Sequence, residues 1–154
     1  MTFGADHAVL LGRLEDALRI APEPTVDLFS KIVAGACTRV PVLGRSGKTS
    51  RIAELLACGA WTDAALALVD MELPAWTLRR LVYESGEWFC SLSRQPNLPA
   101  AMDDTADGNH ELLPLAILLA FVEARRAQSV PRVVSAVPTV QPGAADYVCC
   151  ENFA

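Results

Sequence analysis

The chain of 154 residues is long enough for one compact domain with a buried core and a tail. Its formal net charge of −5 disfavours binding to duplex DNA, because proteins that neutralise phosphates usually carry a basic surplus. Hydrophobic residues make up 52 %, yet the longest charge-free helical stretch, residues 112–122, is well short of the roughly 20 residues that cross a bilayer.

Two helices are predicted in the first 36 residues. Asp6 can cap the first, because its carboxylate can accept hydrogen bonds from free amides of the first turn. Thr25 can cap the second in the same way, and Gly35 lies near its expected end. The next residues, 37–48, lack a periodic apolar pattern, which predicts a loop. The apolar stripe of the first helix consists of Leu10, Leu11, Leu14, Ala17 and Leu18.

Gly47, Lys48 and Thr49 open the following helix and resemble the end of a phosphate-binding loop. Such a loop needs a first glycine five residues before Gly47, and Val42 stands there instead. The remaining chemistry is that of any helix N-terminus, whose free amides attract anions and which Lys48 would assist. We expect a weak anion site at most, and nucleotide binding through this degenerate loop is the least supported function.

Two further helices are predicted between residues 49 and 73. Ser50 or the threonine before it can cap the first, and Gly59 suits the left-handed conformation that often ends a helix. Thr62 can cap the second, with Trp61 and Leu66 spaced as a hydrophobic staple. The segment ALALVDME resembles a magnesium-binding strand, but its place in the middle of this second helix is the simpler interpretation.

The segment WTLRRLVYESGEWFCSLSR, residues 76–94, carries the clearest strand signal and predicts a β-hairpin. A two-residue turn at Ser85 and Gly86 would set Glu84 opposite Glu87, and facing like charges are unfavourable. We therefore predict a three-residue turn, with Gly86 in the left-handed conformation. The expected partners are then Val82 with Trp88 and Leu78 with Leu92.

Residues 95–109 are predicted to form a loop, because prolines punctuate them. Asp103, Asp107 and Gly108 resemble part of a calcium-binding loop, but Pro114 stands where the bidentate glutamate is needed. We expect neither a metal nor a cofactor there. The acidic residues are better explained as favouring the N-terminus of the next helix.

The last helix, ELLPLAILLAFVEARR, is apolar on almost every side, which predicts a buried central element. Pro114 fits its first turn, and Arg125 and Arg126 suit the negative end of its dipole. From Ala127 onward the chain has several prolines and no helical stripe. This pattern predicts a mostly disordered tail, with a short strand at 132–137 as the alternative.

These elements predict an α+β fold in which an antiparallel β-hairpin or small sheet is packed by helices. A lone hairpin is marginal, so a further strand or a second copy of the chain is expected to complete the sheet. The expected segments are an N-terminal helical part at 1–36, a loop at 37–48, an α-α-β-β-α core domain at 49–127 and the tail at 128–154.

Four hairpin residues are the candidate interaction site: Arg79, Arg80, Tyr83 and Arg94. Arginine interleaved with aromatic residues on a sheet can bind single-stranded nucleic acid or an acidic peptide. The same pattern also fits a solvated sheet face on which arginine stems cover aromatic rings. The sequence alone leaves both interpretations open.

The five cysteines form no C-x-x-C pair, and the two histidines lie far apart, so no zinc site is predicted. Cys58 and Cys90 are expected to be small core residues. Cys149 and Cys150 lie in the predicted tail, where an adjacent pair leaves a redox role open. No local signature of a nucleophile is present, so no catalytic residue is predicted.

Three motifs resemble small uncharacterised bacterial and phage-associated proteins that have an α-β-α sandwich-like domain. They are GAWTDAALALVDMELPAW, GEWFCSLSR and LPLAILLAFVEARR, of which the last is similar to the PLAI helix of those domains. The resemblance covers residues 50–126, about half of the chain. It implies a fold and a mobile-element origin, but no activity and no cofactor.

We therefore expect a cytoplasmic, non-catalytic interaction or accessory protein that uses the hairpin face or a sheet edge. Its expected partner is another protein or a second copy of the chain, and no membrane contact is expected. The alternative is a regulatory nucleic-acid-binding protein that uses the hairpin arginines.

Overall fold

The computed structural model describes residues 3–39 and 47–129, except the side chains of residues 3 and 47–49. Its described helices are α1 (Phe3–Ile20), α2 (Val26–Ala36), α4 (Gly47–Ala57), α5 (Trp61–Glu72), the short 3-10 helix η1 (Ala100–Met102) and α6 (Leu113–Ser129). Three strands, β1 (Thr77–Glu84), β2 (Glu87–Ser93) and β3 (Thr105–His110), form an antiparallel sheet in the order β1-β2-β3. The predicted α+β class is confirmed.

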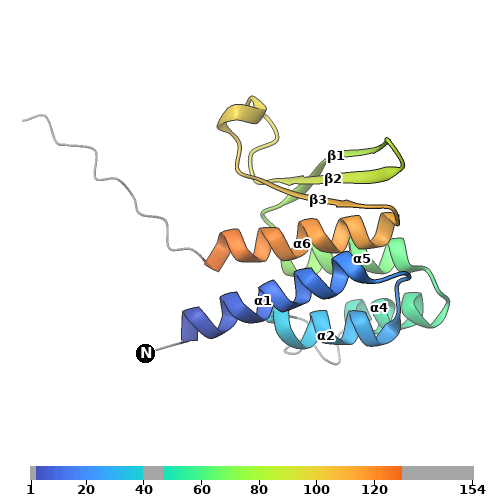
Figure 1. The fold of residues 1–154 in the computed structure, drawn as a ribbon. Coiled ribbons are helices and arrows are strands. Elements are labelled where there is room, and N and C mark those ends of the chain that lie inside the picture. The colour runs from blue at the N-terminus through green and yellow to red at the C-terminus, as the bar shows by residue number, and fades with distance from the viewer. Residues whose placement is uncertain (1–2, 40–46, 130–154) are drawn as a thin grey trace, which may run out of the picture.

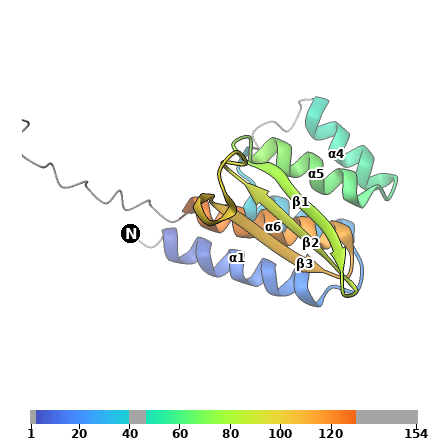
Figure 2. The ribbon, with the colours of Figure 1, turned by 90° about the horizontal axis from the view of Figure 1, so that it is seen from above.

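The elements form three layers (Figure 1). The sheet lies on one side of α6, and α2 and α4 lie in the layer farthest from the sheet. Seen from above, α1 runs along the β3 side of the sheet and α5 along the β1 side (Figure 2). One hydrophobic cluster includes residues from both N-terminal helices, from α5, from the sheet and from α6.

Helix α6 is the central element, as its sequence predicts. Every residue from Leu115 to Val122 is buried, because the sheet covers one side of the helix and other helices cover the rest. Burial of each large side chain, such as Phe121, contributes roughly 1.5–3 kcal/mol. Pro114 lies in the first turn, as expected, where its missing amide hydrogen costs little.

At the helix ends, some of the predicted capping interactions are confirmed and others are wrong. The amide of Leu28 donates a hydrogen bond to Thr25 Oγ1 at 3.2 Å, so the predicted cap of α2 is confirmed. Gly59 has the expected left-handed backbone, with φ of 71°. The predicted Thr62 cap is wrong, because α5 begins one residue earlier, after Ala60, and no side chain caps it.

The turn of the hairpin is shorter than predicted. Glu84 pairs with Glu87, so the turn has two residues, Ser85 and Gly86, and not three. Their φ angles of 55° and 90° are those of a type I′ turn, whose twist matches the flanking strands. Both glutamates are exposed, so water and salt weaken their repulsion and the turn geometry sets the register.

This turn also changes which side chains share a face. Val82 pairs with Phe89, where the three-residue turn predicts Trp88. A bulge after Leu78 shifts the register of β1, and Leu78 therefore meets Leu92 as predicted. Val82 and Phe89 consequently lie on the outer face of the sheet, which no described helix covers in Figure 2.

Strand β3 corrects the predicted loop at residues 95–109. Its sequence, TADGNH, is poor in the branched and aromatic residues that favour strands, yet it pairs with β2 over its whole length. Gly108 allows this strand to lie against α6. A Cβ atom there would lie 2.4 Å from the carbonyl oxygen of Ala116 and 2.5 Å from the amide nitrogen of Ala120. Because glycine has no Cβ, β3 can pack directly on the backbone of α6.

The predicted tail falls mostly outside the described residues, as does most of the predicted loop. Residues 128 and 129, assigned to the tail from the sequence, belong to α6. Residues 130–154 and 40–46 lie outside the described ranges, so the predictions made for them are not addressed by the structure.

Replacing Gly108 with alanine is expected to destabilise the fold by about 3 kcal/mol, the upper end of the usual range for overpacking, because the new methyl group would overlap the backbone of α6. The free energy of unfolding in urea measures this loss. Gly12→Ala is the matched control, since a Cβ there has no neighbour within 4 Å and alanine favours a helix. A Gly108→Ala variant as stable as the parent would contradict the packing described above.

Candidate functional site

Strand β3 is an edge of the sheet, and no other described strand pairs with its outer side. The amide of Arg94 donates a hydrogen bond to the carbonyl of Asp104 at 3.2 Å, which continues the ladder between β2 and β3. Backbone groups alternate in direction along an antiparallel strand. Thr105, Asp107 and Asn109 therefore direct their amide and carbonyl groups toward the open side.

Two hollows follow this open edge. One of about 230 Å³ lies between α1, β3 and α6, and Arg19 and Asp107 help to line it. The other, of about 380 Å³, lies at the end of β3, where Arg19, Asn109 and His110 help to line it. The hollows share Arg19 and together run beside the whole of β3. We call them the β3 groove.

The charged side chains that line the β3 groove are mainly acidic. Five carboxylate side chains reach it, whereas Arg19 is the one arginine or lysine among the lining residues. Asp107 and Glu111 are exposed, so they are open to a ligand. The five acidic residues are Glu15, Glu87, Asp107, Glu111 and Glu123.

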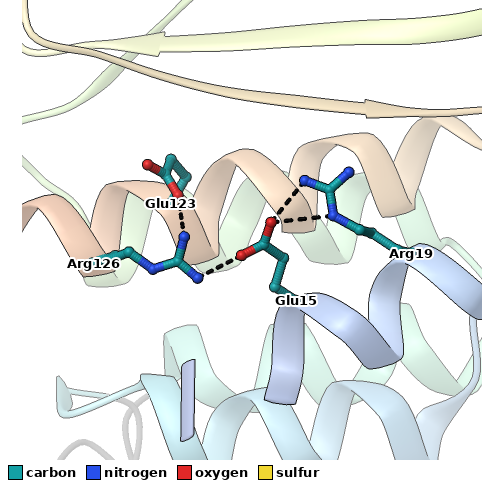
Figure 3. Close-up of polar contacts among 4 residues, drawn as sticks. All are labelled: Glu15, Arg19, Glu123 and Arg126. Carbon is teal, nitrogen blue, oxygen red and sulfur yellow. Dashed lines mark hydrogen bonds and ion pairs between the residues drawn. The ribbon is translucent and has the colours of Figure 1, made fainter. Parts of the chain in front are cut away.

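A network of ion pairs fixes the wall that α1 and α6 contribute (Figure 3). Glu15 on α1 accepts hydrogen bonds from Nε and Nη2 of Arg19, at 3.1 and 2.7 Å, and another from Nη2 of Arg126 on α6. Nη1 of Arg126 also donates to Glu123 Oε2 at 2.8 Å. Glu15 therefore links two helices that are far apart in sequence.

The same contacts set the protonation state of the network. The hydrogen bond from Arg126 and then that from Arg19 lower the pKa of the Glu15 carboxyl, and they outweigh the opposite effect of burial. The pKa of Arg126 is raised, first of all by its hydrogen bond to Glu15. Both groups therefore stay charged at neutral pH.

Asp103 fixes the loop that leads into β3. Its Oδ2 accepts hydrogen bonds from Arg79 and from the hydroxyl of Ser93, and its Oδ1 accepts one from the amide of Gln95 at 3.0 Å. Burial would raise the pKa of this carboxyl, but the hydrogen bonds and the charge of Arg79 lower it. The residue that resembled a calcium ligand is therefore part of a structural ion pair.

The three arginines of the predicted interaction site lie in different surroundings. Arg79 is held by Asp103, and its side chain is 24 % exposed. Arg80 lies on the outer face of the sheet, 5.6 Å from the ring centre of Phe89. Arg94 lies beyond the end of β2, 5.9 Å from the ring centre of Trp76.

Tyr83 lies at the turn end of the hairpin, opposite Trp88, with the two ring centres 5.2 Å apart. Side chains alternate between the faces of a strand, so Tyr83 points away from the face that carries Arg80. The four predicted residues therefore do not form one continuous surface.

The predicted anion site is addressed only in part. Helix α4 begins at Gly47, earlier than the predicted cap at Ser50 or the residue before it. The side chains of Lys48 and Thr49 lie outside the described residues, so the anion site stays a prediction. Asp70 is exposed on α5, in a helix and not in a strand, as the sequence predicts.

The buried cysteines are structural. Burial, aided by the charge of Asp107, raises the pKa of the Cys90 thiol to about 12, and burial also raises the pKa of Cys37. Both thiols stay protonated and are poor nucleophiles at neutral pH. The predicted core position of Cys90 is confirmed, but that of Cys58 is wrong because this residue is exposed. Cys149 and Cys150 lie outside the described residues.

Within the described ranges, no cluster of three or more histidine, cysteine or acidic side chains could hold a metal ion. Nor is any helix in these ranges long and apolar enough to cross a membrane. Searches against protein-family models, curated proteins and solved structures find no match. The resemblance to phage-associated domains therefore stays an expectation.

Sequence reasoning missed the β3 groove because its walls come from three distant segments. The Glu15–Arg126 pair joins residues 111 positions apart. One local signal was present, since Glu15 and Arg19 stand four residues apart on a predicted helix. Asp107 and Asn109 could not be placed on a strand edge from the sequence, because β3 itself was not predicted.

Glu15→Gln should lower the free energy of unfolding by about 1 kcal/mol at pH 7, because it removes the charge that both arginines contact. The pKa of Glu15 is lowered on folding, so this contribution is complete above the usual value of 4.5 and is lost as pH falls through the folded-state pKa. Urea unfolding from pH 7 to pH 2 should therefore show the two proteins converging at low pH.

Asp16→Asn is the control, since it removes the same charge from an exposed neighbour on α1. A stability difference between the parent and Glu15→Gln that does not change with pH would contradict the role assigned to the Glu15 carboxylate.

Proposed function

We propose that the protein is a non-catalytic interaction protein whose β3 groove binds an extended, basic segment of a partner protein. The observation that carries this proposal is the coincidence of an open strand edge with an acidic groove along its length. Each feature supplies a different part of the binding energy.

The open edge supplies backbone hydrogen bonds. The outward groups of Thr105, Asp107 and Asn109 alternate along β3 in the pattern that an added strand requires. A partner segment in extended conformation would pair with these groups and lie between β3 and α1. Peptides bind other interaction domains in this way, with main-chain hydrogen bonds giving affinity and side-chain pockets giving specificity.

The carboxylates supply selectivity for charge. Asp107 and Glu111 are exposed beside the edge, whereas Glu123 on α6 is paired with Arg126. The charge of Arg19, the one arginine or lysine in the lining, is paired with Glu15. A segment that carries lysine or arginine is therefore favoured over an acidic or neutral one, and it would associate faster at low salt.

The hairpin arginines give less support to the nucleic-acid alternative. Arg79 is engaged by Asp103, and Arg80 shares the outer face with Glu84, whose carboxylate lies 3.9 Å from its guanidinium. Glu87 faces Glu84 across the turn on the same face. Phosphate binding there would meet nearby negative charge.

A fluorescently labelled peptide of about nine residues that alternates lysine and threonine is a suitable probe, because it can span the six residues of β3 with a few residues to spare. Fluorescence anisotropy should show binding that weakens as salt rises, whereas a glutamate–threonine peptide should not bind. The Asp107→Lys variant should bind the basic probe about tenfold more weakly. Asp70→Lys makes the same change of charge on α5, away from the groove, and should leave the affinity near that of the parent.

Asn109→Pro tests the backbone contribution separately. This substitution removes an outward amide without removing a carboxylate, and proline is tolerated on the open side of an edge strand. Loss of binding with an unchanged circular dichroism spectrum would support strand addition. Equal affinity for the parent, Asp107→Lys and Asn109→Pro would refute the proposed site, as would a failure of the basic probe to bind the parent.

A further inference from the structure

Strand β1 is the other edge of the sheet, and no described strand pairs with its outer side. In the view from above, the turn end of the hairpin projects clear of α4 and α5 (Figure 2). The side chains of Arg80 and Glu84 are 59 % and 67 % exposed, and Tyr83 is 56 % exposed. This part of β1 is therefore accessible to another strand.

The direction of the backbone groups is fixed by the two-residue turn. Residues that flank such a turn pair through hydrogen bonds, so the backbone groups of Glu84 and, two residues away, Val82 point toward β2. The amide and carbonyl groups of Leu81 and Tyr83 then point to the open side. A strand added to this edge has to hydrogen-bond with Leu81 and Tyr83.

Residues 80–84 have the sequence RLVYE. The two charged residues, Arg80 and Glu84, have opposite charges and each lies two residues from Val82. If two such strands run antiparallel with Val82 facing its own copy, Arg80 of each lies opposite Glu84 of the other. Leu81 then faces Tyr83 of the other copy, and these are the residues whose backbone groups point outward. The charge pattern and the hydrogen-bond pattern therefore select the same register.

We infer that two copies of the chain associate through β1, in antiparallel orientation about Val82, to form a continuous six-stranded sheet. Two Arg80–Glu84 contacts between copies replace the 3.9 Å contact that the same side chains make along one strand. The bulge that often protects an edge strand lies after Leu78, outside the paired residues. Both β3 grooves stay open, because they lie at the outer edges of the joined sheet.

Charge reversal with rescue tests this register. The molar mass of the parent, measured by sedimentation over a range of concentrations, should change from monomer to dimer. Arg80→Glu and Glu84→Arg should each raise the dissociation constant about tenfold or more, because each sets like charges opposite one another at two places. The double variant Arg80→Glu/Glu84→Arg restores opposite charges at both places and should restore the dimer.

Cysteine cross-linking tests the same register independently. In a non-hydrogen-bonded pair the Cα atoms are about 4.5 Å apart, so Val82→Cys should form a disulfide with its copy under mild oxidation. Glu84→Cys is the control, since in this register it lies about 13 Å from its copy. The parent, treated in parallel, reports any cross-linking by the native cysteines.

The inference would be overturned if neither single charge reversal raised the dissociation constant of the dimer. It would also be overturned if the double variant did not restore the dimer. A monomeric mass at every concentration, or a Glu84→Cys protein that cross-links as well as Val82→Cys, would overturn it as well. Rescue of the dimer together with selective cross-linking at Val82 would support it.

Discussion

The contact between Gly108 and the backbone of α6 is the constraint on which the rest of the structure depends. A Cβ at this position would lie within 3 Å of atoms from three residues of α6, so only glycine permits the approach. The contact holds a strand of low β propensity against the central helix. With β3 in place, the hairpin becomes a three-stranded sheet that has a supported inner face.

The position of β3 also creates the surfaces available for interaction. Its outer edge lies beside α1, and the network centred on Glu15 and Arg126 holds α1 against α6 at that place. The helices cover the inner face of the sheet but pair with neither edge strand. Within the described ranges, a small sheet stabilised from one side thus has two unpaired strand edges, one beside acidic side chains and one with balanced charges.

Patterns confined to one element were predicted well from the sequence. The apolar character of residues 112–122 identified the buried central helix, and Thr25 identified the start of α2. The hairpin was recognised, but its turn was wrong because repulsion between exposed Glu84 and Glu87 is weaker than the conformational preference of the turn. Strand β3 and the groove depend on contacts between distant segments, and local residue propensity does not predict such contacts.

Amide hydrogen exchange along β3 tests the central claim most directly. The amides of Ala106, Gly108 and His110 point toward β2 and should exchange slowly, whereas those of Thr105, Asp107 and Asn109 should exchange fast and become protected when the lysine–threonine peptide binds. Uniformly slow exchange would mean that the edge is already covered. Uniformly fast exchange would mean that no strand is held on α6, and either result would contradict this account.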